Sequence, residues 1–280
     1  MATGKTRHHT LTRIIFSKIM IQNEKLQAAA DTTARAAGPR KKYRRPSVAA
    51  GLWVIKHLEK FISRYSRVPD QPVFDPRDFP WTGLLQDNWR TIRTELDEIM
   101  GDLDRLPNFQ DISKDQVNIS NDERWKTFFL HGYGYRMDGN CSRCPRTARL
   151  VESIPGMYTA FFSILAPGKH IPPHRGPYKG LLRCHLALMV PKPREACWIE
   201  VGGVLCHWEE GRCLVFDDTY KHQVQNNTGG TRVVLFLDIL RPMGLCSSLV
   251  NKMILTLIRW SPYIRDARRN HKAWERGLEY

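Results

Sequence analysis

The stretch from Phe161 to Ile239 constrains the fold of this chain more than any other part of the sequence. It contains short apolar, β-branched and aromatic runs separated by Pro, Gly, Asn and Asp, the clearest being Tyr158–Leu165, Leu186–Val190, Cys213–Phe216 and Val233–Ile239. Short runs with this punctuation predict β-strands. Because no helical pattern alternates with them, they favour an all-β barrel or a double-sheet roll over a parallel α/β sheet.

Polar residues that can bind a metal ion or an anion lie at or near the ends of these apolar runs. They are His174, Arg183, His185, His222 and Arg232. A pocket at the mouth of a β-roll combines apolar walls with a few convergent polar groups. The sequence therefore predicts a ligand site at one end of the roll.

These polar residues belong to an ordered series of motifs. The series is Pro167-Gly168, Pro173-His-Arg-Gly-Pro177, Arg183-Cys-His185, Trp208-Glu-Glu-Gly211, Phe216-Asp-Asp218, His222 and Arg232. With these spacings, residues 125–240 resemble the aspartyl/asparaginyl β-hydroxylase family of Fe(II)- and 2-oxoglutarate-dependent dioxygenases. The flanking sequences are similar to the bacterial branch of that family, which hydroxylates acyl chains of lipid A or ornithine lipids.

The resemblance implies a fold, a set of cofactors and a pair of metal ligands. The implied fold is mainly β with flanking helices around a double-stranded β-helix (jelly-roll, cupin-like) core. The implied cofactors are Fe(II), 2-oxoglutarate and O2, with release of succinate and CO2. His174 and His222 would bind the iron. Oxygenases of this type usually add a carboxylate ligand, but the usual position, two residues after the first histidine, is Gly176. The resemblance implies that two histidines suffice and that water completes this face.

The other site residues follow from the same resemblance. Arg232 with Ser163 would hold the distal carboxylate of 2-oxoglutarate, the arginine through its bidentate fork. Arg183 and His185 would meet the carboxylate nearer the metal, and Arg183 could also face the substrate as a catalytic residue. We expect Asp218 to accept a hydrogen bond from a metal-bound histidine, with capping of a turn as the alternative.

Three other functions remain open from the sequence. The same chemistry could act on Asp or Asn of a protein, or on a small molecule, instead of a lipid acyl chain. A non-catalytic roll could bind zinc through His174, His185 and His222, although such a site needs no dicarboxylate clamp of the Arg232 and Ser163 kind. A basic chain could also bind nucleic acid, but no nucleic-acid motif is present, and we expect no nucleic-acid partner.

The net charge of +15 is concentrated at the two ends of the chain. Residues 1–45 hold eleven Lys/Arg against two Asp/Glu, and residues 241–280 hold eight against three, which leaves the residues between them nearly neutral. Basic ends around a neutral core indicate an anionic surface as partner. We therefore expect a membrane lipid substrate and contact of the basic ends with an anionic membrane. The oligomeric state does not follow from the sequence.

Four segments are predicted. Residues 1–47 form a basic disordered arm, 48–124 an amphipathic lead-in with a covering helix over Gly83–Leu103, 125–242 the dioxygenase domain, and 243–280 a basic amphipathic helical segment. The last of these fits a buried helix and an interfacial membrane anchor equally well.

Several features bear on location. No apolar run reaches the length of a membrane-spanning helix, and Ile14–Ile21 does not suit a signal sequence. Seven scattered cysteines indicate a reducing compartment, and Cys141 and Cys144 are interpreted as two thiols in a loop. We expect a cytoplasmic protein that is peripheral on the inner face of the cytoplasmic membrane.

Overall fold

Two antiparallel β-sheets form the centre of the computed structural model, which describes residues 46–113 and 119–277. The larger sheet has seven strands in the order β1-β9-β6-β11-β4-β2-β3, and the smaller has four in the order β5-β10-β7-β8. The strands are β1 (Val73–Phe74), β2 (Trp125–Gly132), β3 (Tyr135–Arg136), β4 (Met157–Leu165), β5 (His170–His174), β6 (Leu181–Met189), β7 (Cys197–Val201), β8 (Val204–His207), β9 (Cys213–Phe216), β10 (His222–Asn226) and β11 (Arg232–Leu240). This arrangement, with helices on its outside, confirms the predicted mainly-β roll.

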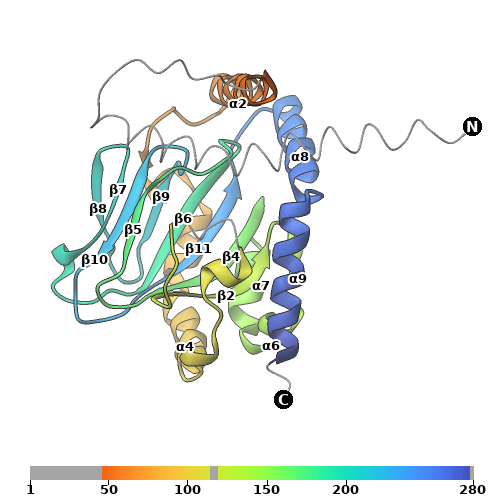
Figure 1. Ribbon diagram of the computed structural model, residues 1–280. Coiled ribbons are helices and arrows are strands. Elements are labelled where there is room, and N and C mark those ends of the chain that lie inside the picture. The colour runs from red at the N-terminus through yellow and green to blue at the C-terminus, as the bar shows by residue number, and fades with distance from the viewer. Residues whose placement is uncertain (1–45, 114–118, 278–280) are drawn as a thin grey trace, which may run out of the picture.

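Helices flank the sheets and do not alternate with the strands (Figure 1). They are α2 (Pro46–Tyr65), α3 (Trp81–Asp87), α4 (Trp89–Met100), α5 (Phe109–Ile112), α6 (Asp138–Arg143), α7 (Pro145–Glu152), α8 (Leu245–Arg259) and α9 (Pro262–Gly277). The last two follow one another down one side of the molecule, and α2 lies against the upper end of α8 (Figure 1). Residues 1–45, which hold most of the predicted basic arm, lie outside the described residues.

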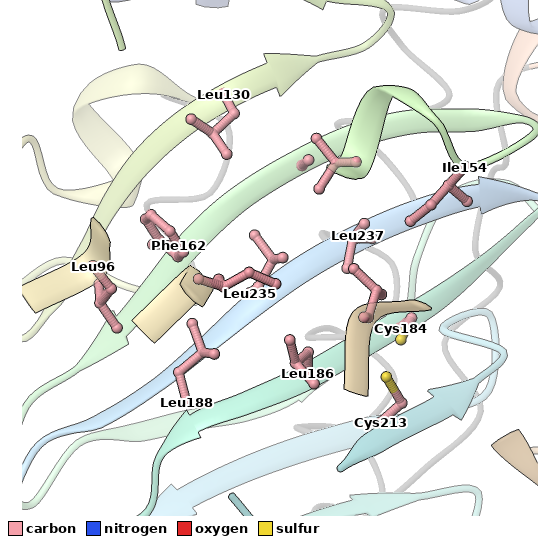
Figure 2. Packing of buried hydrophobic residues seen from close by; sticks show 14 of the residues in the cluster. Leu96, Leu130, Ile154, Phe162, Cys184, Leu186, Leu188, Cys213, Leu235 and Leu237 are labelled. Atoms are coloured by element: carbon pink, nitrogen blue, oxygen red, sulfur yellow. The ribbon is translucent and has the colours of Figure 1, made fainter. Parts of the chain in front are cut away.

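Alternation along the strands of the large sheet separates two apolar clusters. On β11, Val233, Leu235 and Leu237 belong to the cluster on the helix side, whereas Val234 and Phe236 belong to the cluster between the sheets. This follows from the two-residue period of a strand. Figure 2 shows the helix-side cluster, in which residues from neighbouring strands point to one face of the sheet and meet Leu96 of α4. An apolar cluster therefore covers each face of the large sheet.

The predicted covering helix is two helices. The apolar spacing over Gly83–Leu103 correctly indicates helix, but α3 ends and α4 begins at Asn88, whose backbone leaves the helical region at φ −103° and ψ 8°. Its side-chain amide donates to the carbonyl of Leu84 at 2.9 Å, so it ends α3. Glu95 of α4 is buried and accepts the backbone N–H groups of Arg146 and Thr147. Burying this carboxylate is tolerated because it caps the first turn of α7.

The strands predicted around Tyr158–Leu165, Leu186–Val190, Cys213–Phe216 and Val233–Ile239 correspond to β4, β6, β9 and β11. The aromatic sequence Tyr133–Tyr135 also predicts a strand, but only Tyr135 lies in one, because Tyr133 and Gly134 have positive φ angles of 51° and 74° and form the turn before β3. Strand β5 was missed because it contains Pro172 and Pro173. It lies at the edge of the small sheet, where proline is tolerated.

The C-terminal segment has one part that packs on the domain and one part that exposes apolar side chains. Helix α9 packs on the domain, with Asn270 donating to the carbonyl of Ile112 at 3.3 Å and Trp274 to that of Arg105 at 3.0 Å. Helix α8 buries Ile254 and Leu255 but exposes an apolar stripe at four-residue steps, formed by Leu245, Leu249, Met253 and Leu257 and followed by Trp260. No helix among the described residues is long and apolar enough to span a bilayer.

Candidate active site

Four of the polar residues predicted for the site lie on one face of the large sheet, the face that points into the roll. Arg183 and His185 on β6 have the same strand parity as Ala187, and Arg232 on β11 has the parity of Val234 and Phe236. Register brings them together, because Phe236 is opposite His185 and Val234 is opposite Ser163. Residues separated by an even number of positions on a strand point to the same face. Four polar side chains, those of Ser163, Arg183, His185 and Arg232, therefore lie among apolar ones inside the roll.

His174 and His222 are direct cross-strand partners at the ends of β5 and β10. Their ring centroids lie 4.1 Å apart. The Nδ1 atom of His174 lies 2.8 Å from the carbonyl of Pro172, and that of His222 lies 2.9 Å from the carbonyl of Tyr220. If each Nδ1 carries the proton and donates it to that carbonyl, the Nε2 lone pairs are left as ligand atoms.

Both histidines are held in the neutral form that metal binding needs. Burial, followed by the neighbouring His222, lowers the pKa of His174 well below its usual value. Burial and the nearby Arg183 lower the pKa of His222 to about 4. Neutral imidazoles at pH 7 bind a divalent ion without first losing a proton. The pair is therefore suited to a metal.

Arg232 is a buried cation with an unusual environment. It is 1% exposed, and no carboxylate of the described chain pairs with it. Its Nη1 donates to the backbone carbonyl of Ser163 at 3.2 Å, its guanidinium carbon lies 4.7 Å from the ring centre of Trp208, and its Nε has no partner among the described residues. Burial lowers the pKa of this guanidinium to about 10. A buried charge without a partner is costly, which indicates an anionic ligand.

His185 and Trp208 extend this set of unpartnered groups. Within the described residues, both ring nitrogens of His185 and the indole N–H of Trp208 lack hydrogen-bond partners. The two rings lie 6.1 Å apart. The hydroxyl of Ser163 accepts the indole N–H of Trp125 at 3.1 Å. Buried donors that converge without acceptors fit a carboxylate-bearing ligand.

Arg183 is engaged by two buried carboxylates of the chain itself. Its Nε donates to Asp238 at 3.0 Å, and its Nη2 lies 2.8 Å from Asp218. Burial raises the pKa of both acids, that of Asp238 to about 6, and Arg183 counteracts the rise. The charge of Arg183 is therefore balanced by carboxylates of the protein itself, whereas the charge of Arg232 is not. Asp238 was not identified as a site residue from the sequence. Its position was a possible signal, because it follows Arg232 by six residues and therefore points to the same face of β11.

The Asp217–Asp218 pair has two separate roles. Backbone carbonyls, rather than the Asp218 carboxylate, orient the two histidine rings, and Asp218 instead binds Arg183. Turn capping falls to Asp217, which accepts the N–H of Thr219 at 3.0 Å. Asp217 is fully buried between Lys179 and Arg241, and these ion pairs fix the turn that leads to His222. The spacing of the sequence motifs did not predict the contact between Arg241 and Asp217.

A cavity of about 140 Å³ opens beside His174 and Arg183. Its walls are mainly aromatic and aliphatic, with polar groups near the histidine, and the residues that define it include Phe109, Trp125, Phe129, Phe161, Phe236 and Met137. Helix α9 closes one side with Ile264, Ala267, Arg268 and His271. An apolar cavity that meets a few polar groups at one end is typical of a small-molecule or acyl-chain site.

A second group of metal-ligand types lies elsewhere. The ligand atoms of His131, Cys141 and Glu152 lie within 4.8 Å of one another, and no other three-residue group of this kind occurs among the described residues. Burial raises the pKa of the Cys141 thiol to about 11, and Glu152 already accepts Arg136 at 2.9 Å. Cys141 and Cys144 are buried at α6, not in a loop as predicted. A protonated thiol and an ion-paired carboxylate do not favour a metal here.

Comparison with known proteins identifies relatives of the chain. The family model described as "Aspartyl/Asparaginyl beta-hydroxylase" matches residues 86–242. An "Ornithine lipid ester-linked acyl 2-hydroxylase" of Rhizobium tropici is 44% identical over 223 residues, which are 80% of this chain and 79% of that protein. Human "Aspartyl/asparaginyl beta-hydroxylase" is 32% identical over 61% of this chain, but the match spans only 23% of the human protein.

Proposed function

The chain belongs to the aspartyl/asparaginyl β-hydroxylase family, and from this premise we propose that it is an Fe(II)- and 2-oxoglutarate-dependent hydroxylase of lipid acyl chains. Membership of the family makes it a hydroxylase. The cofactors, the lipid substrate and the membrane location are the parts that we propose. The alternative substrate is an Asp or Asn side chain of a protein, or a small molecule.

The observation that carries the cofactor proposal is the buried Arg232, which has no carboxylate partner among the described residues. It lies in the roll with His185 and Trp208, whose polar atoms also lack partners among the described residues. A structural zinc site would leave this guanidinium unexplained, whereas the distal carboxylate of 2-oxoglutarate would neutralise it. The residues present therefore fit this cosubstrate.

The residues of the chain would divide the work as follows. His174 and His222 would hold the iron through Nε2, and Arg232 would hold the distal carboxylate, with Ser163 beside it. Bound iron with 2-oxoglutarate and O2 supplies the oxidising chemistry, which yields succinate and CO2. The aromatic walls of Phe161 and Phe236 would exclude water and would position an apolar substrate near the two histidines.

Two features support a lipid substrate. The Rhizobium tropici relative, which matches over most of both chains, is named as an acyl 2-hydroxylase of ornithine lipid. The cavity next to His174 is lined mainly by apolar side chains, which suit an alkyl chain better than a charged Asp side chain. Arg183 offers little free charge to such a carboxylate, because Asp218 and Asp238 already neutralise it.

A membrane-facing position follows from this substrate. The stripe on α8 exposes 89% of Leu245, 71% of Leu249 and 58% of Met253. The same helix carries Lys252 and Arg259. Apolar side chains flanked by cations bind the interface of an anionic bilayer. We propose that α8 rests on the inner face of the cytoplasmic membrane, with the basic ends of the chain adding electrostatic attraction.

The proposal is tested with purified protein and extracted membrane lipid. Iron-loaded protein with 2-oxoglutarate should add one oxygen to a lipid acyl chain, detected by mass spectrometry, with succinate formed in equal amount. His222→Ala should abolish both products, while His170→Ala, which changes an exposed histidine of β5, should leave them unchanged. Succinate formation without lipid oxidation would move the search to peptides and small molecules. Lipid oxidation that persists in His222→Ala would overturn the site.

A further inference from the structure

Tyr135 contacts two arginines at the rim of the cavity. The guanidinium carbon of Arg259, at the end of α8, lies 4.0 Å from the centre of the Tyr135 ring, and that of Arg268, on α9, lies 4.3 Å from it. The two cations are therefore no more than about 8 Å apart. Like charges at this separation repel one another, and an anion bound between them would offset the repulsion.

No acidic side chain of the described residues pairs with either arginine. Two other arginines near the cavity differ: Arg269 pairs with Asp266, and Arg183 pairs with Asp218 and Asp238. Arg259 is half-buried and Arg268 is exposed. Cation–π contact with Tyr135 accounts for where the two side chains lie, but it does not neutralise them.

The place of this pair in the fold is fixed by its surroundings. The hydroxyl of Tyr158 on β4 donates to the carbonyl of Leu255 at 3.0 Å and ties the last turns of α8 to the large sheet. Tyr135 and Arg268 themselves line the cavity. The exposed stripe of α8 ends at Trp260, next to Arg259. Figure 1 shows α8 continuing into α9 at the edge of the sheet that carries β2 and β4.

We propose that Arg259, Arg268 and Tyr135 form a binding site for the anionic group of an amphiphilic substrate, either a carboxylate or a phosphate, whose alkyl chain enters the cavity. This deepens the proposed function and rests on it. The arginines hold the head of the substrate where the membrane-facing helix meets the cavity, and the chain then extends toward His174. Guanidinium groups suit this role because they bind carboxylate and phosphate through paired hydrogen bonds.

The test measures binding and does not depend on turnover. Full-length protein is titrated by calorimetry with lauric acid, dodecyl phosphate and dodecyl maltoside below their micelle concentrations. Wild type should bind at least one of the two anions more than tenfold more tightly than the maltoside. The double variant Arg259→Gln/Arg268→Gln should weaken anion binding about tenfold or more, which is about 1.4 kcal/mol, and leave maltoside binding unchanged. The anion that loses more affinity identifies the headgroup chemistry.

Two controls separate a binding role from a structural one. Arg269→Gln, which changes the adjacent arginine that pairs with Asp266, should bind all three probes like wild type. Arg259→Lys/Arg268→Lys should keep part of the anion preference, and the melting temperature of each variant reports its folding. Equal loss for all three probes, or no loss for the anions, would overturn the site.

The binding results for wild type distinguish a failure of the headgroup site from a failure of the proposed lipid substrate. Wild type that binds none of the amphiphiles contradicts the lipid substrate and the headgroup site together. Wild type that binds the maltoside as tightly as both anions keeps the apolar cavity and removes the headgroup site alone.

Discussion

The carboxylate of Asp218 fills the space into which any side chain at position 176 would project. A Cβ built on Gly176 would lie 2.0 Å from the Oδ2 of Asp218 and 2.2 Å from its Cγ. The backbone N–H of Gly176 also donates to the carbonyl of Asp218 at 2.7 Å. Gly176 occupies the position at which many Fe(II) oxygenases carry a third, acidic ligand. In this chain an acid from the neighbouring turn lies beside that position and binds Arg183.

Substitution of Gly176 by Ala should therefore disrupt the site. The new methyl group would push Asp218 away from Arg183, and overpacking of this kind costs about 1–3 kcal/mol. Unfolding in urea would measure the loss, and succinate formation should fall with it. Gly229→Ala is a matched control, because a Cβ at Gly229 would meet no atom within 4 Å. Stability and activity of Gly176→Ala equal to those of Gly229→Ala would contradict this contact.

Replacement of Arg232 by Met should separate ligand binding from folding. Removing a buried charge that has no carboxylate partner should keep or raise the melting temperature of the ligand-free protein. Wild type should gain about 3 kcal/mol of stability at 2-oxoglutarate concentrations near one hundred times Kd, and the variant should gain none. Thermal unfolding with and without 2-oxoglutarate measures both effects. Arg212→Met, at an exposed position, should behave as wild type, and a full ligand shift in Arg232→Met would exclude the proposed clamp.

The stability of the protein should fall in acid partly through His271. Burial lowers the pKa of this histidine to about 4, against about 6.5 in an unfolded chain. The unfolded state then binds more protons between these values, so the stabilisation is complete above pH 6.5 and is lost as the pH falls toward 4. His271→Leu should lose about 2 kcal/mol less than wild type between pH 7 and pH 5. Denaturant titrations at both pH values give the difference, and parallel losses would rule this residue out.

The stripe on α8 should be necessary for membrane binding. Leu249→Ser/Met253→Ser removes two exposed side chains whose burial in a bilayer is worth about 1.5–3 kcal/mol each, so co-sedimentation with anionic phospholipid vesicles should weaken at least about tenfold. Val204→Ser/Leu205→Ser removes two exposed apolar side chains on β8 and should have no effect. Equal loss in the two double variants would show that binding is not specific to α8.

The inward polar residues of the site could be predicted because they combine motif spacing with strand parity. His174, His185, His222 and Arg232 all lie in or at the ends of strands, and the roll brings them together. The division of labour between Asp217 and Asp218 could not be predicted in the same way. It depends on Lys179 and Arg241, which reach Asp217 from elements distant in the sequence.

Long-range packing also determines which parts of the C-terminal segment are buried, which the sequence alone did not predict. The apolar pattern of the C-terminal segment allows burial or exposure, and the structure uses α9 for one and the stripe of α8 for the other. The Tyr135 contacts with Arg259 and Arg268 join strand β3 to two helices more than a hundred residues later. No local pattern in the sequence reports such a meeting.

The wall that α9 contributes to the cavity has an evolutionary consequence. Ile264, Ala267 and His271 lie beyond residue 242, where the match to the family ends, while His174 and His222 lie within it. One wall of the cavity therefore comes from outside the matched region, while its other walls and both histidines come from within it. Changes in the last helix could alter the molecules that the cavity accepts and leave His174 and His222 as they are.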